Sequence, residues 1–142
     1  MKRFILFLSA LVLLTACELH TSDNGDLDGY WQLTQMDTLA NNRSGDMRSS
    51  RIFWAVQGKM LEMRCERVYY IINYHFSHEN GQLRLFEPII SVREISDSTV
   101  TDPATLHFYG ITRLEEVLDV QQLDADRMTL QSDLYRFHFR KY

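Results

Sequence analysis

The stretch Ile52–Cys65, which reads IFWAVQGKMLEMRC, decides the fold because two alternating segments surround a two-residue turn, Gly58-Lys59. A turn of that length fixes which residues face each other across a hairpin. Three pairs then share one apolar face: Ile52 with Cys65, Trp54 with Met63, and Val56 with Leu61. The opposite face is mixed. The stretch therefore predicts a β-hairpin that buries one side.

Two further turns give the same result. Asn80-Gly81 is a strong hairpin signal, and Ser132-Asp133 has turn composition. The inward pairs that these turns predict are Phe76 with Leu85, His78 with Leu83, Leu130 with Tyr135, and Met128 with Phe137. Three independent turns thus predict three hairpins, each with a coherent inner face.

The rest of the chain reads as short alternating segments, and no amphipathic helix of ordinary length is predicted. The expected strands are Tyr30–Met36, Ile52–Gln57, Met60–Cys65, Val68–Ser77, Gln82–Glu87, Ile89–Ile95, Glu116–Leu123, Arg127–Gln131 and Leu134–Lys141. Sheets with one apolar face must stack or close on themselves. We expect an all-β fold, a small antiparallel up-and-down β-barrel of about eight strands. The alternative is a β-sandwich, because the irregular stretch Ser96–Arg113 can carry a crossover. Asp102-Pro103 predicts one helical turn there, with Asp102 as its cap.

The N-terminus predicts where the protein resides. Met1-Lys2-Arg3 is positive, an apolar run follows, and Leu14-Thr15-Ala16-Cys17 ends it. The apolar run is too short to cross a bilayer, which takes roughly 18 to 20 residues. The segment resembles the lipobox of bacterial lipoproteins, which implies cleavage before Cys17 and acylation of that cysteine. We expect a signal peptide at 1–16, an acylated Cys17 with a polar tether at 17–28, and a barrel domain at 29–142.

The residue after Cys17 bears on which membrane holds the lipid anchor. Glu18 stands where an aspartate would favour the inner membrane of Gram-negative bacteria, so the resemblance implies an outer-membrane lipid anchor. The domain faces either the periplasm or the outside. The mature chain has 126 residues, with 13 Lys and Arg against 19 acidic residues and a net charge of −6. Such a surface repels phosphate backbones, so nucleic-acid binding is not expected. Cys65 has no intramolecular partner, and its inward phase predicts an inert buried thiol.

A family resemblance rests on Gly29-Tyr30-Trp31, which opens the first strand, and on the basic end of the last strand. These residues and the succession of hairpins resemble the lipocalins, or calycins, in particular the small lipocalin-like lipoproteins of Gram-negative bacteria. The resemblance implies that Trp31 closes the barrel floor and that Arg140 stacks over it, with Arg136 as the substitute. Alternatively, Trp31 is an ordinary core residue.

Two functions remain open at this stage. A barrel of about eight strands can hold one small ligand or be filled by its own side chains. In the first case a small apolar ligand enters beneath the loops Thr38–Ser50 and Ser96–Arg113. The expected ligand-binding residues are Trp54, Tyr70, Tyr74, Phe108, Tyr109 and Tyr135. In the second case the barrel is structural and docks an envelope protein, and the many inward aromatic rings favour a filled interior.

No catalytic, metal or cofactor site is predicted. His75 and His78 are three positions apart on a strand and therefore face opposite sides, so they cannot share a metal ion. Neither a nucleophile elbow nor a glycine-rich phosphate loop occurs. We expect a protein that is not an enzyme and has no cofactor, with the membrane as one partner.

Overall fold

The computed structural model describes residues 22–142, so Cys17 and the signal segment lie outside the described residues. Strands and short 3-10 helices follow one another along this part of the chain: η1 (Gly25–Leu27), β1 (Gly29–Thr38), β2 (Arg43–Asp46), η2 (Arg48–Ser50), β3 (Ile52–Gln57), β4 (Met60–Cys65), β5 (Tyr70–Glu79), β6 (Gln82–Val92), β7 (Ile95–Thr99), η3 (Pro103–Tyr109), β8 (Glu116–Leu123), β9 (Arg127–Gln131) and β10 (Tyr135–Lys141). Within residues 22–142, no helix has the length and apolar composition needed to cross a membrane.

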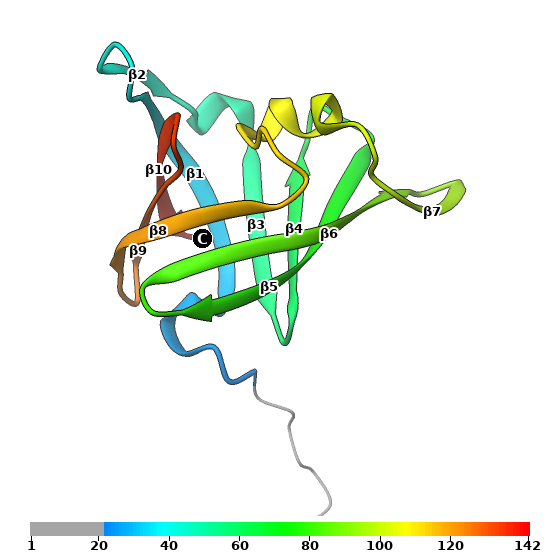
Figure 1. Ribbon diagram of the computed structural model, residues 1–142, viewed down its shortest axis with the longest axis horizontal. Helices are drawn as coiled ribbons and strands as arrows, with labels where there is room; N and C mark the ends of the chain where they lie inside the picture. The colour runs from blue at the N-terminus through cyan, green and yellow to red at the C-terminus, as the bar shows by residue number, and fades with distance from the viewer. Residues whose placement is uncertain (1–21) are drawn as a thin grey trace, which may run out of the picture.

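Eight strands close into an antiparallel barrel (Figure 1). Their order is β1-β3-β4-β5-β6-β8-β9-β10, and β10 pairs back to β1 with Trp31 opposite Lys141. Strands β2 and β7 are additions that pair with β1 and β6. The predicted up-and-down barrel is confirmed. A sandwich is excluded because the first and last strands of the sheet pair with each other.

Two of the three predicted hairpin registers are confirmed, since Val56 pairs with Leu61 and Phe76 with Leu85. The third is wrong by one position in the turn. Leu130 pairs with Phe137 and Met128 with Phe139, instead of Tyr135 and Phe137. The hydroxyl of Ser132 accepts hydrogen bonds from the backbone N–H groups of Leu134 and Tyr135, which moves the turn to Asp133-Leu134. Because each pair shifts by two residues, the inward phase is preserved.

The expected strands Gln82–Glu87 and Ile89–Ile95 are one strand, β6, with a bulge between them. The pairing with β5 slips between Asn73 and His75, opposite Glu87 and Pro88. Glu87 has a φ of 53°, and Pro88 has no N–H to donate to a ladder. The bulge therefore bends β6 without ending it, and the strand continues to Val92.

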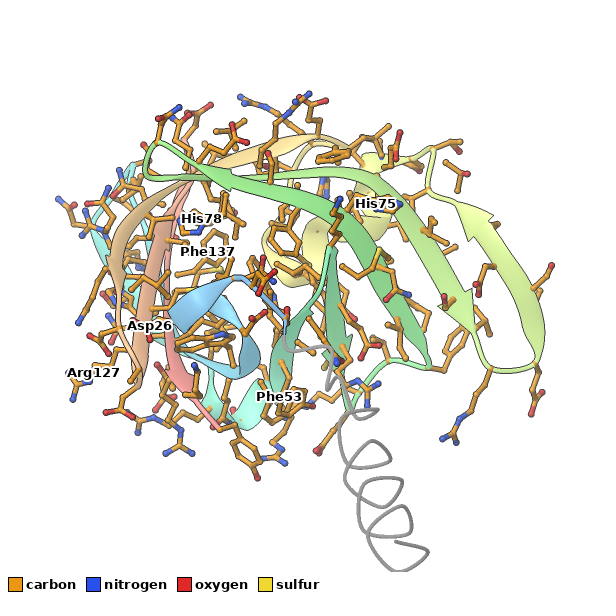
Figure 2. The ribbon with its side chains drawn as sticks, turned by 90° about the horizontal axis from the view of Figure 1, so that it is seen from below. Asp26, Phe53, His75, His78, Arg127 and Phe137 are labelled. Carbon is orange, nitrogen blue, oxygen red and sulfur yellow. The ribbon has the colours of Figure 1, made fainter. Side chains whose placement is uncertain are left out.

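Both long stretches expected as loops contain regular structure. Thr38–Ser50 contains β2 and η2, and Ser96–Arg113 contains η3 and most of β7. The turn Arg93-Glu94 returns the chain onto β6 as a hairpin, which explains why Ile95 starts a new strand. Figure 2 shows this β6–β7 hairpin extending away from the ring of strands.

The floor of the barrel is covered by η1, which Figure 1 shows beneath the strands. Leu27 is fully buried, and the indole N–H of Trp31 donates a hydrogen bond to its carbonyl over 2.9 Å. The stretch 17–28, expected as a polar tether, is thus packed against the barrel from Ser22 onward. One apolar side chain among polar neighbours accounts for the difference.

The opposite end is covered by η3. Asp102 caps it by accepting a hydrogen bond from the N–H of Ala104 over 2.9 Å, as predicted. Leu106 and Tyr109 are buried, and Gly110 ends the helix with a φ of 77°. Figure 1 shows η3 and η2 both at this end, away from η1. We call this the η3 end, and the end covered by η1 the floor.

Candidate functional site

The barrel interior is filled by large side chains. Trp54 is fully buried, with its ring centroid 4.7 Å from that of Phe139 and 6.1 Å from that of Phe137. Figure 2 places Phe137 inside the ring of strands. The other fully buried side chains of the core include Leu33, Leu61, Met63, Ile72, Leu83 and Leu118. The inward phase of the strands is therefore used for packing.

The six residues expected to bind a ligand do not line one cavity. Trp54 and Tyr74 are fully buried in the core, whereas Phe108 is exposed on η3. Tyr109 plugs the η3 end, and its ring lies 6.5 Å from that of the half-buried Tyr70. The half-buried Tyr135 packs against Phe137 at the start of β10. The structure thus distributes these side chains among the core, the cap and the surface.

Two buried polar atoms of the interior have no hydrogen-bond partner in the described structure, Trp54 Nε1 and Tyr74 Oη. Burial raises the pKa of the Tyr74 hydroxyl, and the carboxyl of Glu116 raises it further. Glu116 is itself buried, and burial raises its pKa while the N–H of Thr112 donates to Oε2 over 3.4 Å. A buried group without a partner costs about 1–3 kcal/mol. The barrel interior therefore contains two polar groups whose hydrogen-bonding capacity the surrounding side chains do not satisfy.

The cation over the floor tryptophan is Lys141, and the expectation of Arg140 is wrong. Lys141 Nζ lies 4.6 Å from the Trp31 ring, because Lys141 pairs directly with Trp31 and so points to the same face. Arg140 alternates outward and donates to Gln32 Oε1 over 3.0 Å. The substitute, Arg136, also points outward and donates to Gln131 Oε1. Trp31 itself is fully buried at the floor.

A groove of about 1140 Å³ is lined by the β4–β5 connection and the β6–β7 hairpin, where β4 and β5 separate. The β4–β5 ladder ends at the pair Met63 and Ile72, so Arg64 and Cys65 diverge from the start of β5. The apolar part of the groove is made by Val68, Tyr69, Tyr70, Ile71, Val92 and Ile95. We call this surface the hairpin groove, because the β6–β7 hairpin forms its second wall.

The hairpin groove combines exposed apolar side chains with charges of both signs. Tyr69 is 82% exposed and Ile95 is 68% exposed. The charged lining residues are Arg64, Glu66, Arg93, Glu94 and Asp97. Cys65 borders the groove but is buried, and its thiol donates to the carbonyl of Ser50 over 3.0 Å.

Sequence reasoning missed this groove. The expected strand Val68–Ser77 includes Tyr69, and the expected strand Ile89–Ile95 includes Arg93-Glu94, so neither prediction points to a shared surface. The composition of Arg93-Glu94 between two alternating segments was the only available signal. Which side chains meet there depends on the separation of β4 from β5, a tertiary feature.

The histidines lie as the strand phase predicts. His75 faces outward beside Phe86, with ring centroids 6.0 Å apart, and His78 is exposed at the rim. Among residues 22–142, no three His, Cys, Asp or Glu side chains gather as a metal site would require. A histidine that was not singled out, His138, contacts Asp37 on the outer face of β1 and β10, with 2.7 Å between Nε2 and Oδ2.

Together, the barrel and the N-terminal motif define a class of protein, a closed eight-strand barrel that carries a lipid attachment site. The family model of the prokaryotic membrane lipoprotein lipid attachment site matches residues 1–17. The family model of the lipocalin-like domain matches residues 12–142. The chain therefore belongs to the lipocalin-like domain family, and it is a membrane-anchored lipoprotein of the cell envelope.

Solved structures support the same fold. The chain is similar to a lipocalin-like protein from Bacteroides uniformis, with 19% identity and a TM-score of 0.63 over 83% of this chain and 100% of that one. It is also similar to an uncharacterized protein from Bacteroides eggerthii, with 16% identity and a TM-score of 0.60 over 81% and 98%. No curated protein matches the chain at a significant level.

Proposed function

We propose that this lipoprotein is a non-enzymatic docking protein that binds a protein partner in the hairpin groove. One observation carries the proposal: the interior is filled by side chains and covered at both ends, while the hairpin groove is open and exposes apolar side chains. An exposed apolar cluster bordered by polar residues is typical of an interaction site. The alternative expectation of a filled, docking barrel is thus the one that the geometry supports best.

The chemistry of the hairpin groove favours a protein as the occupant. Protein interfaces combine an aromatic and aliphatic centre with a polar rim, and Tyr69 with Ile95 provides such a centre. The rim contains two arginines and three acidic residues. Mixed charges suit pairing with a protein surface, whereas anionic lipid or nucleic acid would favour a basic rim.

The proposal also includes the location of the protein in the cell, which is the outer membrane. Glu18 in place of an aspartate after the lipidated cysteine supports outer-membrane anchoring. The side of that membrane on which the barrel lies follows from neither the motif nor the fold. Protease accessibility in intact cells distinguishes the two sides, since only a surface-facing barrel is digested.

A site-specific photo-crosslinker in intact cells tests the docking function. With the crosslinker in place of Tyr69, we expect one discrete protein adduct, which Ile95→Asp removes by placing a charge in the apolar centre. Leu134 is the matched control, because it is 47% exposed and lies in the β9–β10 turn, which contributes no residue to the groove. Absence of an adduct at Tyr69, or an adduct of equal yield at Leu134, contradicts the proposal.

A second candidate function is capture of a small ligand in the interior. It is favoured by the unpartnered Trp54 Nε1 and Tyr74 Oη, which an acceptor on a ligand would satisfy. Intrinsic fluorescence titrations of the whole protein with fatty acids, retinoids and haem test it, because Trp54 would report binding. Saturable quenching that Trp54→Phe abolishes supports capture, and no saturable change with any of them opposes it.

A further inference from the structure

We propose that the floor of the barrel faces the lipid bilayer and that the η3 end, with the hairpin groove, faces away from it. The proposal rests on the lipid attachment site at Cys17 and not on the docking function. It assigns the floor as the surface next to the membrane. It also excludes membrane insertion as the purpose of the exposed apolar side chains in the hairpin groove.

The first step is that the chain after the anchor is fixed to the floor. Ser22 Oγ accepts a hydrogen bond from the N–H of Gly58 over 2.6 Å, and Asn24 donates to the carbonyl of Gly58 over 2.8 Å. Asp28 accepts from both Ser22 and Asn24. These contacts attach residues 22–28, which we call the lead, to the β3–β4 turn. Leu27 of the lead is buried in the core and also holds it in place.

The second step is the length of chain that remains. Five residue steps separate Cys17 from Ser22. A fully extended chain spans at most about 3.3–3.6 Å per residue, so Ser22 lies within roughly 18 Å of the acylated cysteine. The floor therefore stays close to the headgroups.

The third step is the distance from the floor to the hairpin groove. Strand β4 runs from the Gly58 turn to Cys65, which borders the groove. Seven residues at about 3.3 Å each give roughly 23 Å along the strand, somewhat less along the tilted barrel axis. Tyr70 Oη also donates to the carbonyl of Thr105 in η3, so the groove belongs to the η3 end. Figure 1 shows the lead and η3 at opposite ends of the barrel.

The surface chemistry agrees with this orientation. Of the six large apolar side chains exposed within residues 22–142, Tyr69, Ile95 and Phe108 lie at the groove or on η3, where the short connection keeps them from the lipid. Tyr142, at the end of β10 near the floor, packs against the Phe53 ring with 5.2 Å between centroids. Around the floor, Asp26 of η1 and Asp124 and Asp126 of the β8–β9 turn are exposed carboxylates. These side chains stay hydrated and do not insert into lipid. The floor is therefore held near the bilayer by the anchor and not by burial in it.

Fluorescence quenching on vesicles tests the orientation. The full acylated protein, with Cys65→Ser in every variant, is labelled at Lys59→Cys on the floor or at His107→Cys on η3; both positions are exposed. The vesicles contain phosphatidylethanolamine and phosphatidylglycerol with a headgroup-attached quencher. Because the two ends differ by about 20 Å in distance from the lipid, we expect at least about two-fold stronger quenching at Lys59→Cys.

Two further variants keep the result unambiguous. Ala125→Cys and Ala104→Cys repeat the comparison at second exposed positions of the floor and of η3, and circular dichroism verifies folding of all four. A ten-residue Gly-Ser insertion after Glu18 should reduce the difference between the ends, because the longer connection no longer limits the distance. Equal quenching at both ends, stronger quenching at η3, or no effect of the insertion overturns the proposal. None of these outcomes depends on whether the groove binds a partner.

Discussion

Asp37 shows how a single residue ties the two strands that close the barrel. Its carboxylate, on β1, contacts His138 of β10 over 2.7 Å and accepts a hydrogen bond from Gln35 over 2.7 Å. Burial alone would raise the pKa of Asp37, but the hydrogen bonds from His138, Gln35 and Ser44 outweigh it and lower the pKa to about 2. The charged form is therefore the one that the fold stabilises.

The stability of the protein should depend on this carboxylate in a defined pH range. The pKa of Asp37 in the fold lies below the ordinary aspartate value of 3.8, so the contribution is present above pH 3.8 and is lost as the pH falls toward 2. Asp37→Asn should lower the free energy of unfolding by about 2 kcal/mol at pH 7. Urea unfolding from pH 7 to pH 3 should show the difference from wild type narrowing below pH 4.

The matched control is Asp97→Asn on β7, because Asp97 is exposed and has no ion pair among those formed within residues 22–142. Exposed substitutions of this kind change stability by less than about 0.5 kcal/mol. An Asp37→Asn effect no larger than that of Asp97→Asn, or one that stays constant between pH 7 and pH 3, would show that the closing strands do not depend on this contact.

Elements could be predicted from the sequence where local chemistry determines them. The turns Gly58-Lys59 and Asn80-Gly81 specify their registers, and Asp102-Pro103 specifies the start of η3. The register predicted for the β9–β10 hairpin is wrong, because the hydroxyl of Ser132 accepts a backbone hydrogen bond that places the turn one position later. Strand β7 was not predicted, because it is exposed along its whole length and no alternation of apolar residues marks it.

The fit of η3 into the barrel end is tested at Gly110. A Cβ there would lie 2.7 Å from Cε1 of Phe137 and 3.0 Å from Sδ of Met36, at a φ of 77°. Gly110→Ala should therefore lower the free energy of unfolding by more than about 2 kcal/mol, through overpacking in addition to backbone strain. Denaturant unfolding followed by tryptophan fluorescence measures this loss.

Gly81→Ala separates the two causes. Gly81 has a similar φ of 73°, but nothing lies within 4 Å of an added Cβ. We expect a loss of about 1 kcal/mol from backbone strain alone. If the two substitutions cost the same, η3 does not pack tightly against the core.

The floor element η1 should be part of the folded domain and not of a tether. Leu27→Ala removes a fully buried side chain and should cost about 2–5 kcal/mol in denaturant unfolding. Leu134→Ala is the control, because that side chain is about half exposed and its loss should cost about 0.5 kcal/mol or less. If Leu27→Ala lowers the free energy of unfolding no more than the control does, residues 22–28 are a tether and not part of the folded domain.

At the scale of the whole molecule, the fold could be predicted from the sequence but the candidate site could not. The inward phases of the hairpins require a closed sheet, and the closure between Trp31 and Lys141 satisfies that requirement. The hairpin groove depends instead on where β4 leaves β5 and on how far β6 projects with β7. These features arise from tertiary geometry, so neither periodicity nor turn composition predicts them.

Native mass spectrometry of the acylated protein, purified in mild detergent from its own host, tests most directly whether a filled barrel works through its outer groove. We predict the acylated chain without a bound small molecule, together with a complex containing one protein partner that Ile95→Asp dissociates. A small molecule that co-purifies with the chain, remains bound in Ile95→Asp and is lost in Trp54→Phe would contradict this account.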